Sequence, residues 1–393
     1  MLWLGAGRRM DSIGARRATF LTMLLFLAQP IHLGHWLSRI SEVQIALDLS
    51  KSELAIALLG MPCGLLPSLY FAGRAVDRFG PRHSLLLVFP PMLVAGFLPG
   101  LATDMRTLFA ALFLLGACVA FVEVSLNVFA AMTERCFGVR IMSRAHGFWS
   151  LGVALGSLVG IQLARAGLSA GAALMLSAAI LLPLLQIVAA SLPGKDSAPG
   201  DAPEHDDARG PVSRALLPIV IVVFGATIVE GAMNDWATVY MRETHWGGTY
   251  NDALALTVFT AMVTIGRFSG DAINRRLGAA ALARICLGSA IAGIALLVTG
   301  HSVWMSFAGF ALAGFGVSTI FPLGISASAS LSRRGEARNV SVMTFGALSG
   351  FLIGPPMIGY VAEATSLKLA LGLLLPTLVL SFVLAARLAP RPR

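Results

Sequence analysis

Apolar runs of about 20 residues recur along the whole chain, separated by short polar or arginine-bearing turns. A run of this length crosses a bilayer as an α-helix, whereas the strands of a membrane β-barrel alternate apolar and polar residues. Only 12% of the residues are charged, against about a quarter in soluble domains. The sequence therefore predicts an all-α integral membrane protein with about twelve transmembrane helices. The runs begin near Phe20, Ser52, Ser84, Arg106, His146, Ala170, Ala215, Asp252, Leu282, Val303, Val340 and Leu367.

The basic residues lie in alternate loops and do not gather on one soluble face, although the formal net charge of +9 could by itself suggest a nucleic-acid partner. Arginines precede the first run and occupy every second loop, while the intervening loops carry acids such as Glu42, Asp104 and Glu363. The positive-inside rule places the arginine-bearing side in the cytoplasm. We predict a multi-pass protein of the plasma membrane, a bacterial inner membrane, with both termini cytoplasmic, the lipid bilayer as its surroundings and no nucleic-acid partner.

A polar stretch rich in Gly, Pro and Ala, from Pro193 to Pro211, is typical of a flexible cytoplasmic linker. It predicts an N-terminal half at 1–192, a linker at 193–213 and a C-terminal half at 214–393, with about six spans in each half. The halves share features at fixed offsets. Arg78-Phe79-Gly80 recurs as Arg276-Leu277-Gly278, 198 residues later (276 minus 78), and Gly116 recurs as Gly314. A ladder at Gly152, Gly156 and Gly160 recurs at Gly346, Gly350 and Gly354, and such small residues let helices approach closely.

The loop between the second and third runs reads Gly-Arg-x-x-Asp-Arg-x-Gly-x-Arg from Gly73 to Arg82. With two halves of about six spans and a central linker, this signature resembles the major facilitator superfamily of secondary transporters, over essentially the whole chain. The resemblance implies pseudo-symmetric halves that rock about a central site, and a loop that locks them on the cytoplasmic side in one state. An ordinary loop that only sets topology is the alternative interpretation. The residues assigned to this cytoplasmic gate are Gly73, Arg74, Asp77, Arg78, Gly80, Arg82, Arg144 and His146, with Gly266, Arg267, Asp271 and Arg276 as the echo in the second half.

Two further segments are similar to the sugar-porter-like, fucose-permease-related bacterial branch of that superfamily. They are Glu230 to Trp236 in the seventh span and Gly354 to Gly359 in the eleventh. Drug/proton antiporters of the superfamily usually carry a proline in a glycine-rich fifth span, and here that span has Gly152, Gly156 and Gly160 without a proline. This departure makes an efflux pump the second choice.

Ionisable residues inside the spans are candidates for proton coupling, because burying a charge at the bilayer centre costs about 2.5 to 3.5 kcal/mol on insertion scales. Glu123 is followed four residues later by Asn127, and Glu230 by Asn234, so each pair shares a helical face. We predict Glu123, Glu230 and Asp235 as proton-coupling residues. A structural pairing of Glu123 with a base such as Arg144 is the alternative. Asp235 lies about 140° around the helix from Glu230, which favours a structural role for it.

The same segments supply the predicted substrate site. Amides, carboxylates and indoles suit a hydroxylated or amine-bearing solute through hydrogen bonds and stacking. Span one adds a polar stripe around Pro30, and the 198-residue offset makes His32 equivalent to Glu230 (230 minus 32). A structural histidine is the alternative for His32. Phe321-Pro322 and Pro355-Pro356 are predicted helix breaks, either for bending or as static kinks. The predicted substrate-binding residues are Gln29, His32, Trp36, Asn127, Glu230, Asn234 and Trp236.

The sequence has no phosphate-binding Gly-rich loop ending in Lys-Ser/Thr, no paired-histidine metal motif and no nucleophile elbow. We therefore expect no enzyme activity, no cofactor and no metal. The hypothesis is a secondary transporter that moves a small polar organic solute, a sugar or related metabolite, by alternating access with proton coupling, as a monomer. The alternatives are an efflux pump for drugs or amphipathic metabolites and, from another class, a membrane sensor or scaffold without transport.

Overall fold

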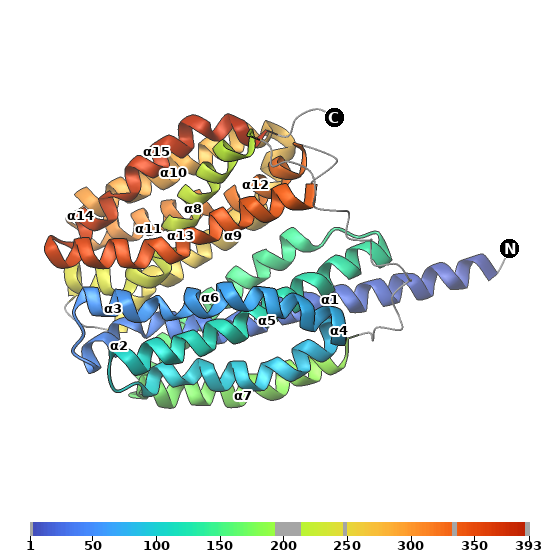
Figure 1. The fold of residues 1–393 in the computed structure, drawn as a ribbon, viewed down its shortest axis with the longest axis horizontal. Helices are drawn as coiled ribbons and strands as arrows, with labels where there is room; N and C mark the ends of the chain where they lie inside the picture. The colour runs from blue at the N-terminus through green and yellow to red at the C-terminus, as the bar shows by residue number, and fades with distance from the viewer. Residues whose placement is uncertain (1–2, 193–213, 247–249, 332–335, 390–393) are drawn as a thin grey trace. The chain divides into compact units, whose positions relative to one another are not determined.

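The structure is a computed structural model that describes residues 3–192, 214–246, 250–331 and 336–389. Within these ranges every regular element is a helix, which confirms the predicted all-α class (Figure 1). The first part of the chain forms α1 (Trp3–Ser38), α2 (Ile40–Ala46), α3 (Lys51–Leu58), α4 (Gly60–Phe97), η1 (Leu98–Leu101), α5 (Met105–Phe137), α6 (Met142–Arg165) and α7 (Ala170–Ala190). The second part forms α8 (Leu216–Met241), η3 (Arg242–Trp246), η4 (Tyr250–Ala253), α9 (Leu254–Leu277), α10 (Ala279–Thr299), α11 (Val303–Val317), α12 (Ile320–Ala329), α13 (Glu336–Ala364), α14 (Leu367–Gly372), α15 (Leu374–Leu384) and η5 (Ala385–Leu388).

The number of membrane spans follows from three observations on the described residues. Ten helical stretches there are long and apolar enough to cross a bilayer. One of them, Lys51–Leu101, is 51 residues long and contains a non-helical residue, Gly80, so it comprises two spans. The 24-residue helix α9 is outside the ten because it carries Arg267, Asp271, Arg275 and Arg276, yet it has the length of a span. Counting Lys51–Leu101 as two spans and adding α9 brings the ten stretches to the predicted twelve spans.

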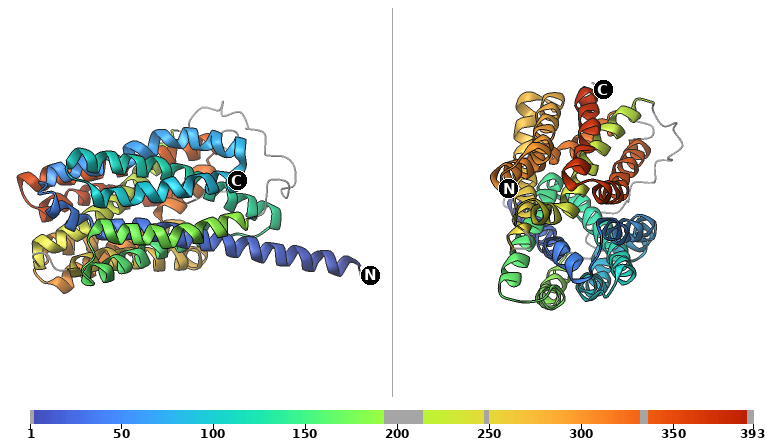
Figure 2. Two further views of the ribbon diagram at one scale, coloured as in Figure 1. Left: turned by 90° about the horizontal axis from the view of Figure 1, so that it is seen from below. Right: turned by 90° about the vertical axis from the view of Figure 1, so that its left-hand side faces the viewer.

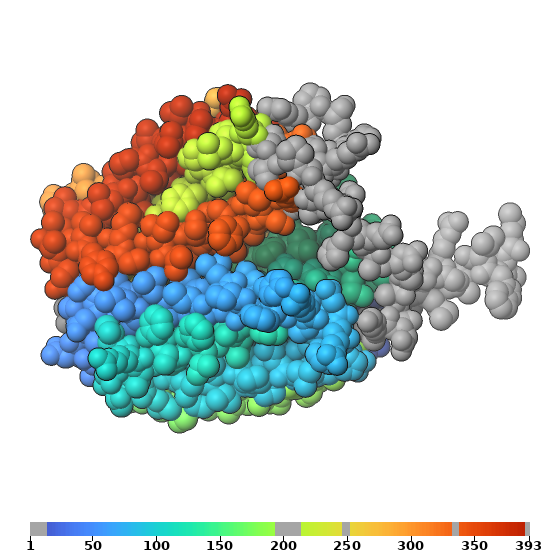
Figure 3. Space-filling view, in the orientation of Figure 1, coloured from blue at the N-terminus to red at the C-terminus, as the bar shows by residue number. Residues whose placement is uncertain are grey.

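The described chain divides into two units by its internal contacts. Unit 1 contains residues up to Trp36 and from Leu59 to Gly200, and unit 2 contains Leu37–Leu58 and the chain from Asp201 onward. The long helices of each unit run alongside one another (Figure 2). In unit 1, α4 packs against α5, and in unit 2, α8 packs against α13 (Figure 3). The predicted linker 193–213 lies outside the described residues, so the boundaries predicted from the sequence stay a prediction.

The internal repeat is visible in backbone conformation and in packing. Gly80 and Gly278, 198 residues apart, have φ/ψ of 77°/160° and 80°/160°. A positive φ is strained for residues with a Cβ, so glycine lets the chain turn sharply between adjacent spans at both places. A Cβ on Gly116 would overlap the carbonyl of Met61, and a Cβ on Gly314 would overlap the carbonyl of Phe259, which is also 198 residues later (259 minus 61). Each half therefore uses the same close helix contact.

Four helices that begin at loops predicted to face outward have side-chain caps at their first residue. Asp104 accepts from Thr107 N at 2.8 Å in a capping box at α5. Ser169, Ser302 and Ser366 accept from backbone N–H groups at α7, α11 and α14. These side chains satisfy N–H groups that have no partner within the helix, and they fix where each span starts.

Candidate functional site

The tenth span, Val303–Ala329, is interrupted in its middle, where α11 ends at Val317 and α12 begins at Ile320. Pro322 explains the interruption, because it has no N–H to donate to the carbonyl of Ser318 four residues earlier. The regular pattern resumes at Leu323, whose N–H donates to Thr319 O at 3.1 Å. The predicted break near Phe321-Pro322 is present, and it frees the Ser318 carbonyl inside the span.

Arg267 of α9 donates to that carbonyl. Its Nε lies 3.4 Å from Ser318 O, and its Nη2 lies 3.1 Å from Oε1 of Glu230 on α8. Gly266 packs against Ser318, where a Cβ would overlap the hydroxyl, so α9 can approach the break closely. One guanidinium thus connects the seventh, eighth and tenth spans of unit 2.

The Glu230–Arg267 ion pair is largely buried, with side-chain exposures of 12% for Glu230 and 13% for Arg267. Neither charge is favourable alone at this depth, and removing one partner of a buried pair typically costs about 3 to 5 kcal/mol. Loss of either charge is therefore expected to destabilise this part of unit 2.

The rest of the α8 cluster extends outward from Glu230. Asn234 lies one turn further along the same face, half-buried, and its Oδ1 has no hydrogen-bond partner in the described part of the chain. Asp235 is also half-buried. Trp236 is completely buried and packs near Gly359 of α13 and Ala55 of α3, which makes it a packing residue of unit 2.

The predicted substrate residues of span one lie in unit 1. His32 Nδ1 is 3.3 Å from the Ser177 hydroxyl of α7, and its ring lies against Gly96 of α4. Gln29 Nε2 lies 3.7 Å from the sulfur of Met92, and Trp36 is buried. Gln29 and His32 are therefore packed among α1, α4 and α7, and their contact with substrate stays a prediction.

Glu123 and Asn127 lie on one face of α5. The Asn127 amide donates to the Glu123 carbonyl at 2.9 Å and to its carboxylate at 3.3 Å. Arg144 donates to the Arg140 carbonyl at 3.1 Å, and the His146 ring packs edge-on against Phe26 with the ring centroids 5.6 Å apart. Proton coupling by Glu123 remains a prediction.

The loop signature is partly helical and makes local contacts. Arg74 stacks on Tyr70 at 4.3 Å, Arg78 lies over Phe79 at 5.4 Å, and Asp77 is exposed. Arg82 donates to the carbonyl of Ala190 at the end of α7 at 2.8 Å, which suits a base near a helix C-terminus.

The echo of the signature in the second half lies within α9. Asp271 and Arg276 are exposed near its end, and Gly266 is buried. Arg267, which we expected in the gate, lies ten residues before the last residue of α9 (277 minus 267). That is about 15 Å inside the span, where Arg267 binds Glu230.

Sequence reasoning missed three groups. The Ser318 carbonyl could have been found by counting four residues back from Pro322. The Glu134 carboxylate accepts hydrogen bonds from the N–H groups of Ile141 and Met142 and so caps α6. The sequence around Glu134 does not indicate this role. The third group is a polar cluster, called the outer cluster because it lies at the end of unit 2 that the sequence predicts to face outward.

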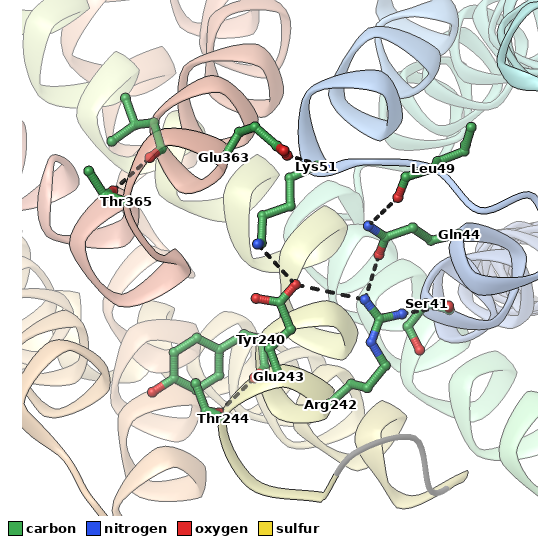
Figure 4. Close-up of polar contacts among 11 residues, drawn as sticks. Ser41, Gln44, Leu49, Lys51, Tyr240, Arg242, Glu243, Thr244, Glu363 and Thr365 are labelled. Carbon is green, nitrogen blue, oxygen red and sulfur yellow. Dashed lines mark hydrogen bonds and ion pairs between the residues drawn. The ribbon is translucent and has the colours of Figure 1, made fainter.

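This outer cluster consists of Ser41, Gln44, Lys51, Arg242, Glu243 and Glu363 (Figure 4). Arg242 donates to the Ser41 carbonyl and to Gln44 Oε1, both at 2.8 Å. Lys51 pairs with Glu243 at 3.4 Å, and its backbone N–H donates to Glu363 at 2.8 Å. The segment 37–58, which the sequence joins to spans one and two, is thereby bound to α8, η3 and α13.

Asp252, in η4 next to the outer cluster, is 4% exposed, and its Oδ1 has no hydrogen-bond partner among the described residues. Burial raises the pKa of this carboxyl from 3.8 to about 6, although the nearby charge of Arg242 opposes the rise. Asp252 can therefore change charge at mildly acidic pH.

The fold and this site define a multi-pass helical membrane protein with a charged pair inside its spans. The chain belongs to the Major Facilitator Superfamily, whose family profile matches residues 18–302, and it is a membrane transporter of that superfamily. The membership predicted from the loop signature is confirmed.

Two curated relatives match nearly the full length. The uncharacterized transporter y4wD of Sinorhizobium fredii is 29% identical over 88% of this chain and 91% of its own. An uncharacterized MFS-type transporter of Yersinia pestis is 26% identical over 94% of this chain and 95% of its own.

Solved structures of low identity share the fold. The nucleoside transporter NupG has a TM-score of 0.73 at 14% identity, covering 95% of this chain and 98% of its own. The fucose:proton symporter FucP of E. coli has a TM-score of 0.61 at 16% identity, covering 97% of this chain and all of its own. At these identities the likeness shows the fold, and it carries no substrate across.

Proposed function

We propose that this protein is a proton-coupled secondary transporter that moves a small polar organic solute, a sugar or related metabolite, across a bacterial inner membrane by alternating access. The observation that carries the proposal is the Glu230–Arg267 pair beside the broken tenth span. A carboxylate that is ion-paired inside a span binds a proton at the cost of that pair, so protonation and conformation are linked. The protein acts as a monomer with both termini in the cytoplasm.

Glu123 is the second proton-coupling residue in this proposal. Its carboxylate and the Asn127 amide form a polar pair within α5. In unit 2, Asn234 adds hydrogen-bonding capacity on the same face as Glu230.

The experiment is uptake into proteoliposomes of radiolabelled sugars, polyols, nucleosides, amino sugars and sugar acids, with and without an inward proton gradient. We expect accumulation of at least one polar solute that requires the gradient. Glu230→Gln should abolish gradient-driven accumulation but retain exchange of labelled for unlabelled solute, since exchange needs no net proton movement. Asp48→Asn is the matched control, because Asp48 is an exposed loop acid.

Two outcomes contradict the proposal. Movement of lipophilic compounds alone, unaffected by Glu230→Gln, would favour an efflux pump. No flux of any compound in protein that is folded and correctly inserted would favour a sensor or scaffold.

A further inference from the structure

We propose that the transported solute carries a carboxylate, which replaces Glu230 as the partner of Arg267 when Glu230 is protonated. This inference rests on the proposed function and narrows its substrate class to small hydroxylated carboxylates. Three observations support it: how Arg267 is held, the charge balance of the site, and the position of Asn234.

Arg267 has a second partner besides Glu230. Its Nε donates to the Ser318 carbonyl, a backbone group left free by Pro322, while Nη2 donates to Oε1 of Glu230. When Glu230 accepts a proton, the backbone contact keeps the guanidinium at the break. A planar guanidinium is the side chain best suited to bind a carboxylate with two parallel hydrogen bonds.

The charge balance of the pair favours an anionic solute. With the site empty, Glu230 and Arg267 sum to zero. With one proton and one monoanion bound, the protonated Glu230, the guanidinium and the carboxylate again sum to zero. A proton with a neutral solute leaves a charge of +1, and an anion without a proton leaves −1. Both of these are costly at this depth, so neutrality couples the anion to the proton.

Other ionisable groups lie on α8 itself and on the elements packed against it. No acid or base occurs in α11, α12 or α15. The ionisable residues on the helices are Asp235 and Tyr240 on α8, Asp271, Arg275 and Arg276 on α9, and Arg338, Tyr360 and Glu363 on α13. The shorter elements carry Glu42, Arg242, Glu243, His245, Asp252, Lys368 and Arg387. Of these, Asp235 is the next carboxyl on α8 itself, five residues after Glu230.

Asn234 suggests what the rest of the solute carries. Its Oδ1 is buried and has no partner in the described chain, one turn of α8 beyond Glu230. A buried acceptor of this kind needs a donor, and a hydroxyl on the solute supplies one. A carboxylate on Arg267 and a hydroxyl near Asn234 define a small hydroxy acid.

The test measures anion binding at Arg267 without knowledge of the natural substrate. Glu230→Gln imitates the protonated acid and leaves Arg267 without this counter-charge. We expect sodium acetate to raise the Tm of purified Glu230→Gln protein by about 2 °C or more over its effect on the wild type, since a ligand that binds the folded state stabilises it. Acetamide, which has the same shape and no charge, should have no effect.

Two double variants keep the test decisive. Glu230→Gln/Arg267→Gln should lose the acetate effect, and Glu230→Gln/Arg267→Lys, which keeps the positive charge, should retain part of it. The inference would be overturned if acetate raised the Tm of all variants equally. It would also be overturned if acetate raised the Tm of none of them. If Glu230→Gln did not fold, the two double variants would decide: an equal change in Tm with acetate in both would contradict the inference.

The uptake experiment separates this inference from the proposed function. Gradient-driven uptake of a neutral sugar, together with no acetate effect in Glu230→Gln, leaves proton-coupled transport intact and refutes the anionic substrate. Uptake of a sugar acid but not of the corresponding neutral sugar supports both.

Discussion

Asp252 is a buried carboxyl in η4 whose raised pKa makes the stability of unit 2 depend on pH. Its pKa is raised to about 6 by burial, so between about pH 4 and 6 the folded state binds a proton that the unfolded state has released. The stability contributed by this proton is present at low pH and is lost as pH rises through 6.

We therefore expect Asp252→Asn to be more stable than the wild type at pH 7.5 by about 1 to 3 kcal/mol, because the cost of the buried charge is removed. At pH 4 the two proteins should be nearly equal. Unfolding in detergent, followed by Tm across this pH range, is the measurement. An advantage of the same size at both pH values would contradict the assignment, and Asp48→Asn should show no pH-dependent advantage.

At the scale of elements, two glycines hold equivalent helix pairs together. Gly116→Ala and Gly314→Ala each place a Cβ against the backbone carbonyl of the neighbouring helix, which cannot rotate away as a side chain can. We expect each change to lower the free energy of unfolding by about 1 to 3 kcal/mol. Gly73→Ala is the matched control, since no atom lies within 4 Å of its added Cβ.

Loss of transport in Gly73→Ala at unchanged stability would support the predicted gate.

The break in the tenth span gives a second prediction for an element. Pro322→Ala restores an N–H that can bond to Ser318 O, so α11 and α12 should become more continuous and Arg267 should lose an acceptor. We expect a higher Tm and slower transport, measured on the same preparation. Faster transport would contradict a role for the break.

The elements were the part most open to prediction from sequence. Apolar runs and loop arginines predict the spans, and the sequence repeats at Gly80 and Gly278 and at Gly116 and Gly314 correspond to a shared backbone conformation and shared packing. The site was harder, because Glu230 and Arg267 are 37 residues apart on different helices (267 minus 230) and pair only through tertiary packing. The glycine beside Arg267 also matched the loop signature, which directed attention to the gate instead of to the span. Arg242 was not recognised as central to the outer cluster, because one of its partners is a backbone carbonyl.

For the molecule as a whole, the outer cluster determines how firmly the segment 37–58 is held. We expect Arg242→Gln combined with Lys51→Met to speed amide hydrogen exchange in α3 by about tenfold or more, because a charged hydrogen bond contributes about 1.5 to 3 kcal/mol and about 1.4 kcal/mol is a factor of ten. Mass spectrometry of peptides from α3 measures this, with peptides from α5 as the internal reference. Unchanged exchange in α3 would show that apolar packing alone holds the segment.

The same segment has a consequence for fragment complementation. The chain enters unit 2 for Leu37–Leu58, returns to unit 1, and enters unit 2 again after Gly200. A C-terminal fragment cut at the linker therefore contains Trp236 and Gly359 but lacks α3, which covers them. Two co-expressed fragments would have to exchange part of their chain before either was complete, and the second fragment alone would expose the surface of α13 that α3 covers.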